Sequence, residues 1–98
     1  MVESTDNINT LLTSFLRSRG VSLVGIFGSY TRGEANENSD IDLLVRFTNP
    51  KSLFEIIKIE QDLSYKLGRR IDLVTESALH PYLRPKVFKD LKIVYGSR

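Results

Sequence analysis

Two aspartates and a glycine–serine pair, separated by ten residues, could do chemistry together in this sequence. Gly28-Ser29 follows the apolar run VSLVGIF, and Asp40-x-Asp42 opens the apolar run IDLLVRF. Side chains alternate between the two faces of a strand, so Asp40 and Asp42 would point the same way. Asp72 repeats the pattern in a third apolar run. If the second and third strands are neighbours, three carboxylates converge near one end of a sheet.

Converging carboxylates indicate a site for a divalent cation. They repel one another and are costly to desolvate, and a cation removes both penalties. Hard oxygen ligands favour Mg²⁺ or Mn²⁺, and Mg²⁺ usually combines a few carboxylates with substrate phosphates. Gly28 would let a ligand approach the backbone closely, and Ser29 would offer a hydroxyl and an N–H to a phosphate. The pattern therefore predicts a metal–nucleotide site.

Each of these residues also fits a structural role when it is taken alone. A glycine–serine pair after a strand is common in plain turns, and Asp40 or Asp72 could be a cap or a solvated turn residue. Asp42 favours the functional interpretation, because it lies inside a strand pattern, where Asp is disfavoured.

The hydrophobic pattern predicts the order helix, strand, strand, helix, strand, helix, strand. The expected helices begin at Thr5 or Asp6, Ser52 and Pro85 and end at Gly20, Gly68 and Leu91; the expected strands are 21–27, 40–47, 69–75 and 92–95. In the second helix, the side chains expected to point inward are Leu53, Ile56, Ile57, Leu63 and Leu67. We expect one α/β (α+β) domain over residues 1–98, a small mixed β-sheet packed with helices.

Composition narrows the function classes. The 98 residues carry a net charge of only +2, with no cysteine, so disulfides and thiolate metal sites are excluded. Scattered bases argue against nucleic acid as the main partner. The bases that a nucleic acid could use are Arg69, Arg70, Arg84, Lys86, Lys89 and Lys92. Neither a signal peptide nor a membrane-spanning run is present, so we expect a cytoplasmic protein.

The motif resembles that of a known family. The stretch GIFGSYTRGEANENSDIDLLV is similar to the signature of the minimal nucleotidyltransferases (MNT), small members of the polymerase-beta-like nucleotidyltransferase superfamily. RRIDLV resembles the strand with the family's third carboxylate, and LHPYLRPKVFKDLKIVYG resembles its usual tail. The resemblance implies a nucleotidyltransferase-like fold. It assigns metal binding to Asp40, Asp42 and Asp72, and nucleotide binding to Gly28, Ser29, Arg32 and Gly33.

The resemblance also implies a partner and a reaction. Minimal members of this family are typically paired with a helical protein of the HEPN class, often a ribonuclease toxin, and act as antitoxins. We therefore expect Mg²⁺-dependent (or Mn²⁺-dependent) transfer of AMP from ATP to a hydroxyl, in the first instance a tyrosine, of a HEPN-type toxin, with release of pyrophosphate.

The expected roles of the site residues follow from that reaction. Ser29 would hold the triphosphate, and Asp40 and Asp42 would hold the metal on it. Asp72 would complete a second metal site or accept the proton of the attacking hydroxyl. Arg32 would neutralise phosphate charge, or would be a solvated loop arginine. The alternative function is a non-catalytic antitoxin that neutralises its partner by stoichiometric contact, and self-association stays open.

Overall fold

The elements follow the expected order along the chain. The computed structural model describes residues 5–28, 31, 33 and 40–96. Its strands are β1 (Val21–Phe27), β2 (Ile41–Phe47), β3 (Ile71–Thr75) and β4 (Lys92–Tyr95), and its helices are α1 (Thr5–Arg17), α2 (Leu53–Leu67), the short 3₁₀ helix η2 (Glu76–Ala78) and α3 (Arg84–Asp90). The predicted α/β class with a small mixed sheet is confirmed. The short helix η2 was not predicted.

The four strands form one sheet in the order β3-β2-β1-β4. β1 is antiparallel to both β2 and β4, whereas β2 and β3 are parallel. Parallel neighbours need a long connection between them, and α2 supplies it. The second and third strands are therefore neighbours, which was the condition for their carboxylates to meet.

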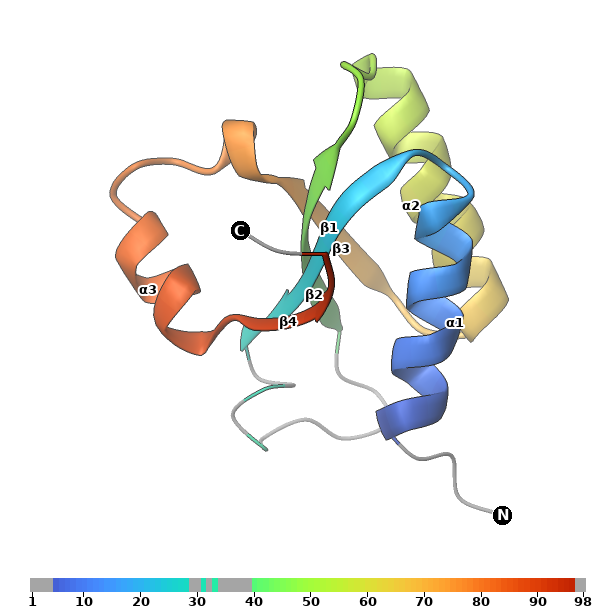
Figure 1. The fold of residues 1–98 in the computed structure, drawn as a ribbon, viewed down its shortest axis with the longest axis horizontal. Helices are drawn as coiled ribbons and strands as arrows, with labels where there is room; N and C mark the ends of the chain where they lie inside the picture. Colours follow the sequence, from blue (N-terminus) through green and yellow to red (C-terminus); the bar gives the residue numbers. More distant parts are fainter. Residues whose placement is uncertain (1–4, 29–30, 32, 34–39, 97–98) are drawn as a thin grey trace.

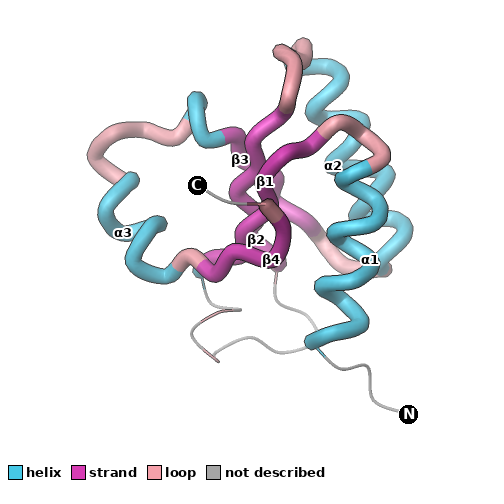
Figure 2. The backbone as a smooth tube through the Cα atoms, viewed as in Figure 1, coloured by secondary structure: helices cyan, strands magenta, loops and turns pink. Residues whose placement is uncertain are grey.

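Helices cover both faces of the sheet. Figures 1 and 2 show α1 and α2 together on one side and α3 on the other. The larger core lies on the α1–α2 side and includes the fully buried Leu43 and Leu63. A smaller cluster on the α3 side contains Leu44 and Val87. Because β2 is covered on both faces, its apolar residues run without alternation.

Both ends of α2 are where the sequence predicted them. Ser52 Oγ accepts the Glu55 N–H at 3.2 Å, and a Glu55 carboxylate oxygen accepts the Ser52 N–H at 3.1 Å. This reciprocal capping box satisfies two backbone donors at the start of the helix. Gly68, at φ +67°, ends the helix in the left-handed conformation that glycine adopts without strain.

The prediction for the inward face of α2 is partly wrong. Ile59 and Leu63 are buried and Ile56 and Leu67 pack against the core, whereas Leu53 is 69% exposed and Ile57 38% exposed. Successive residues of a helix are turned by about 100°. The side chain of Ile57 therefore points away from the core that Ile56 contacts. Leu53, four residues before Ile57, lies on the same outward side of the helix.

Within residues 5–28 and 40–96, every helix falls short of the length and hydropathy that a membrane span requires.

Candidate active site

Asp42 and Asp72 lie side by side at one end of the sheet. They are partners in the register of the parallel strands β2 and β3. Neighbouring strands are about 4.8 Å apart, and paired residues point to the same face. That face is the α3 side, because Leu44 and Val74, two residues further along each strand, belong to the cluster under α3. The fold therefore brings two of the three predicted carboxylates together.

Asp40 comes immediately before β2 and faces a cation. Its Oδ2 lies 3.9 Å from Nε of Arg70, and both side chains are partly exposed. The Ile41 N–H donates to the Arg70 carbonyl at 3.0 Å, which ties the starts of β2 and β3 together. Among the described residues, no group of three or more His, Cys, Asp or Glu side chains is close enough to hold a metal ion. The assignment of all three aspartates to metal binding stays a prediction.

Gly28 brings the two halves of the motif into contact. It follows β1 at φ +81°, and a Cβ at this position would overlap with Oδ2 of Asp42. The Thr31 N–H and hydroxyl both donate to the Gly28 carbonyl, at 3.1 and 2.9 Å, so the chain turns sharply here. Only glycine combines this backbone conformation with so close an approach.

The remaining predicted nucleotide-binding residues are less informative. Ser29 and Arg32 lie outside the described residues. Gly33 is exposed at φ +75°, with open space where a Cβ would be. The expected contacts of these three residues with a triphosphate stay predictions.

Two side chains of α2 support Asp72 from the outer edge of β3. The Leu73 N–H donates to Oε2 of Glu60 at 2.7 Å, and the Ile71 N–H donates to Oγ of Ser64 at 3.0 Å. Asp72 lies between these two anchored residues, while its own strand pairs with β2 on the other side. The sequence analysis missed Glu60 and Ser64. Their i, i+4 spacing on the helix was visible, but their role depends on β3 being an edge strand.

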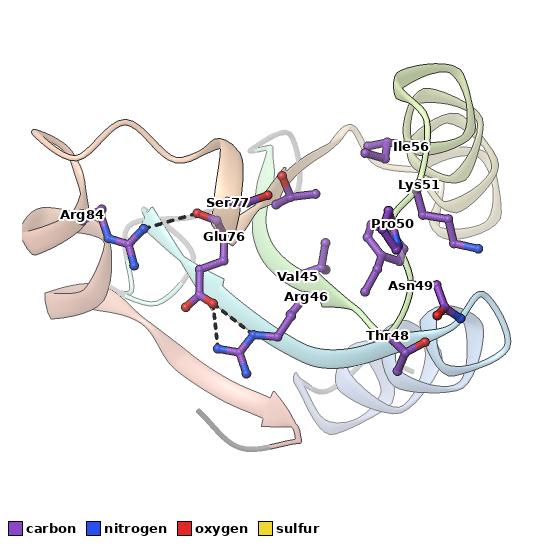
Figure 3. A pocket seen from close by; sticks show the side chains of 12 residues that line it. Val45, Arg46, Thr48, Asn49, Pro50, Lys51, Ile56, Glu76, Ser77 and Arg84 are labelled. Carbon is purple, nitrogen blue, oxygen red and sulfur yellow. Dashed lines mark hydrogen bonds and ion pairs between the residues drawn. The ribbon is translucent and has the colours of Figure 1, made fainter.

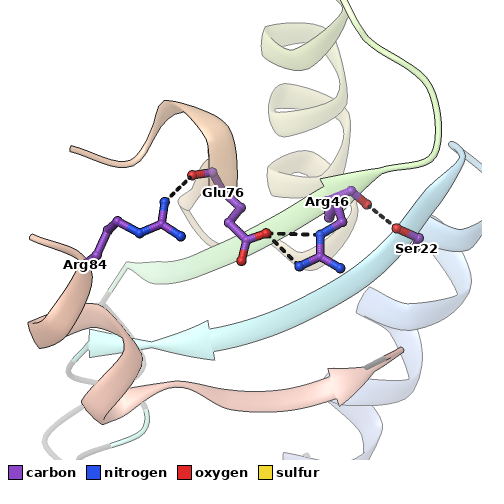
Figure 4. A network of polar contacts seen from close by, with 4 residues as sticks. All are labelled: Ser22, Arg46, Glu76 and Arg84. Carbon is purple, nitrogen blue, oxygen red and sulfur yellow. Dashed lines mark hydrogen bonds and ion pairs between the residues drawn. The ribbon is translucent and has the colours of Figure 1, made fainter. Parts of the chain in front are cut away.

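A cleft lies at the opposite end of β2. It has a volume of about 580 Å³, and its lining includes Arg46, Glu76 and Arg84 (Figure 3). Nε and Nη2 of Arg46 donate to Oε2 of Glu76 at 3.0 and 2.7 Å, and Nη1 of Arg84 donates to the Glu76 carbonyl at 3.4 Å (Figure 4). Four residues of β2 separate Asp42 from Arg46, about 13 Å. This cleft lacks the acid pair, so its size alone does not make it the catalytic site.

The basic residues considered for nucleic acid come from two parts of the fold. Arg70 faces Asp40 at the start of β2, whereas Arg84 lies at the far cleft beside Glu76. Their guanidinium groups also have acidic or carbonyl neighbours already. That nucleic acid is not the main partner stays a prediction from composition.

The nucleotidyltransferase domain family model matches residues 8–94 of the chain. The chain belongs to this nucleotidyltransferase family. It is 42% identical over 94 residues to the protein adenylyltransferase MntA of Thermococcus cleftensis. The aligned residues make up 95% of each chain.

Two solved structures share the fold of this nucleotidyltransferase. A toxin–antitoxin complex with AMP-PNP superimposes with a TM-score of 0.83 at 26% identity, over 92% of this chain and 74% of that one. A tri-AMPylated HEPN toxin of Shewanella oneidensis in complex with its MNT antitoxin gives 0.79 at 22% identity, over 96% of this chain and 74% of that one. The second likeness shows the fold alone.

The described geometry of this nucleotidyltransferase fits a magnesium site. Carboxylate oxygens suit Mg²⁺, which needs only one or two of them when substrate phosphates supply further ligands. Asp42 and Asp72 meet that requirement from adjacent strands, and Gly28 has no side chain that would overlap with the Asp42 carboxylate. Asp40 would join them by exchanging Arg70 for the metal.

Proposed function

We propose that this nucleotidyltransferase is an antitoxin that transfers AMP from ATP to a hydroxyl group of a HEPN-type toxin. The acceptor that we propose is the hydroxyl of a tyrosine side chain. One observation carries the proposal: Asp42 and Asp72 are register partners beside Gly28. The chain's 42% identity to a protein adenylyltransferase supports it. A cytoplasmic location is the sequence's prediction and is part of the proposal.

Each described residue has a stated task in this reaction. Bound Mg²⁺ would supply neutralisation of the phosphate charge. Asp42 and Asp72 would hold it on the α3 face of the sheet, with Asp40 released from Arg70, and the Gly28 turn would let the triphosphate lie against the backbone. The acceptor oxygen bonds to the α-phosphorus, the bond from that phosphorus to the bridging oxygen breaks, and pyrophosphate leaves. The hydroxyl proton passes to the Asp72 carboxylate or to water.

Intact-mass spectrometry of the toxin tests this proposal. After incubation with ATP and Mg²⁺, the wild-type chain should add mass to the toxin in whole AMP units. The double variant Asp40→Asn/Asp42→Asn should add none, because it lacks two of the three carboxylates proposed to hold the metal. Asp62→Asn is the matched control, because this carboxylate makes only an exposed pair with Lys58 at 3.8 Å.

The non-catalytic alternative is decided by the same experiment. If the wild-type chain binds and neutralises the toxin without adding mass, the adenylyltransferase proposal is wrong and stoichiometric contact explains the antitoxin function. Peptide mapping of a modified toxin would identify the acceptor residue. Replacing Mg²⁺ by Mn²⁺, and ATP by GTP, would define the metal and the nucleotide.

A further inference from the structure

An apolar stripe runs along the solvent side of α2. Four of its large hydrophobic side chains are exposed: Leu53 at 69%, Phe54 at 84%, Ile57 at 38% and Tyr65 at 91%. Single exposed hydrophobic residues are ordinary, but several gathered on one helix are not. We call these four residues the α2 stripe.

The α2 stripe is a second apolar face of the helix, separate from its core face. At about 100° per residue, its members fall within one arc of about 120°. The core-facing side chains Ile59 and Leu63 lie on the other side of the helix axis. Glu55, Asp62 and Lys66 occupy an arc between the two apolar faces. A helix that is apolar on two faces is typical of one that is covered on both sides.

The α2 stripe lies beside β3, the edge strand that carries Asp72. Ser64 lies within the arc of the stripe on the helical wheel, and its hydroxyl accepts the Ile71 N–H at 3.0 Å. The stripe extends about 18 Å along the helix, from Leu53 to Tyr65, at 1.5 Å per residue. Since α2 ends at Leu67, only five residues before Asp72, its Tyr65 end lies toward the catalytic edge. A protein lying on the stripe can reach round β3 to the acid pair.

Helix α2 is preorganised for such a contact, because both of its ends and its packing on β3 are fixed by hydrogen bonds. The capping box of Ser52 and Glu55 fixes its first turn, and Gly68 ends it in a left-handed cap. Glu60 and Ser64 anchor it to β3. A partner would therefore pay little ordering entropy on this side of the interface. Two aromatic side chains, Phe54 and Tyr65, supply the residue types that contribute most to binding energy.

We infer that the α2 stripe is the docking surface for the HEPN-type toxin, an inference that rests on the proposed function. The toxin would cover the stripe with an apolar helical patch and present its acceptor hydroxyl round the edge of β3. Buried aromatic side chains contribute about 150–250 Å² each, so the stripe supplies about 500 Å². Two such surfaces total about 1,000 Å², well below the 2,000–5,000 Å² of obligate homodimers. The size favours a protein substrate over a permanent second copy of this chain.

Alanine variants of the stripe test the inference with a HEPN-type toxin, the substrate that the proposed function names. Phe54→Ala and Tyr65→Ala should each raise the KM for the toxin about tenfold, as truncation of an aromatic anchor does, and leave kcat unchanged at saturating toxin. Both variants should melt at the wild-type temperature, because their side chains are already exposed. Tyr82→Ala is the matched control: Tyr82 is 85% exposed but lies outside α2, and its loss should change KM less than twofold.

A chemical block provides a second, independent test. The chain has no cysteine, so a single cysteine can be labelled selectively. The variant Gln61→Cys, at the centre of the stripe, should bind the toxin before labelling. After its cysteine has reacted with a bulky maleimide, it should no longer bind the toxin. Ser77→Cys, on η2, should bind equally well before and after labelling.

The outcomes separate this inference from the proposed function. If stripe variants and labelled Gln61→Cys keep wild-type affinity while AMP is still transferred, the docking surface is elsewhere and the proposed function stands. If the toxin binds through the stripe but gains no mass, the docking surface stands and the adenylyltransferase proposal is wrong. A wild-type chain that neither binds nor modifies the toxin overturns both. If the stripe variants only convert a wild-type dimer to monomers, the occupant is a second copy and the inference is wrong.

Discussion

At the scale of single residues, the contact between Gly28 and Asp42 joins the two halves of the motif. We expect Gly28→Ala to lower the free energy of unfolding by about 1–2 kcal/mol, because alanine is strained at φ +81°. We expect Mg²⁺ and ATP to raise the melting temperature of the wild-type chain, because they bind its folded state. The new methyl group would displace the Asp42 carboxylate, so this rise should disappear in Gly28→Ala. Urea unfolding and thermal shift measure the two effects.

Gly68→Ala is the control for backbone strain at Gly28. Gly68 has φ +67° but open space at its Cβ position, so alanine there should cost similar stability and keep the response to Mg²⁺ and ATP. A full response in Gly28→Ala would contradict the importance of its contact with Asp42.

The acid pair makes a second prediction at this scale. Because Asp42 and Asp72 are register partners, their charges repel in the metal-free protein. Asp42→Asn and Asp72→Asn should each leave stability without metal equal or higher, and the double variant should gain less than the sum of the two. Each single change should abolish the stabilisation by Mg²⁺ and ATP. A loss of more than about 2 kcal/mol in either variant would instead indicate a structural hydrogen bond.

At the scale of elements, α2 protects the outer edge of β3 through two side chains. Glu60→Ala should leave the Leu73 N–H without its acceptor, destabilise the fold by about 1 kcal/mol and speed hydrogen exchange at Leu73. Ser64→Ala should speed exchange at Ile71 instead. Each variant is the control for the other, and uniform acceleration of both amides would show a general loosening of β3.

The start of α2 makes the fold's stability depend on pH. Hydrogen bonds from Ser52, first from its backbone, and the nearby Lys51 lower the pKa of Glu55. A carboxylate with a lowered pKa stabilises the fold above its ordinary pKa and loses that contribution as the pH falls through the folded value. At pH 7 the melting temperature of the wild-type chain should therefore be higher than that of Glu55→Gln. The difference between the two melting temperatures should shrink below about pH 4. A difference that stays constant down to pH 3 would contradict this prediction.

The elements show what the sequence could and could not predict. Apolar runs, Ser52 and Gly68 located the strands and both ends of α2, because these signals are local. The sequence analysis placed Leu53 and Ile57 in the core, but both side chains face solvent. The helical spacing of apolar residues predicts an apolar face and does not reveal that a helix has two. The register of Asp42 with Asp72 needed the parallel pairing of β2 and β3, which the sequence permitted without requiring it.

At the scale of the whole molecule, the sheet lies between the proposed catalytic site and the proposed docking surface. Asp42 and Asp72 lie on the α3 face, whereas α2 covers the opposite face and turns its stripe to solvent. Only the edge strand β3 connects them. The described fold can therefore hold a nucleotide and a protein at once without one blocking the other. This arrangement predicts that catalysis and docking can be removed independently.

A competition experiment tests that independence. Asp40→Asn/Asp42→Asn keeps the α2 stripe and should bind the toxin without modifying it. Added in about tenfold excess over the toxin, it should slow AMP transfer by a trace of wild type about tenfold or more, because it removes free toxin by mass action. The same excess of a variant that also carries Phe54→Ala and Tyr65→Ala should slow transfer far less, because its docking surface is lost while its catalytic site is identical to that of the double variant. Equal inhibition by both would mean that the toxin is held at the catalytic edge itself, and the two surfaces would not be separable.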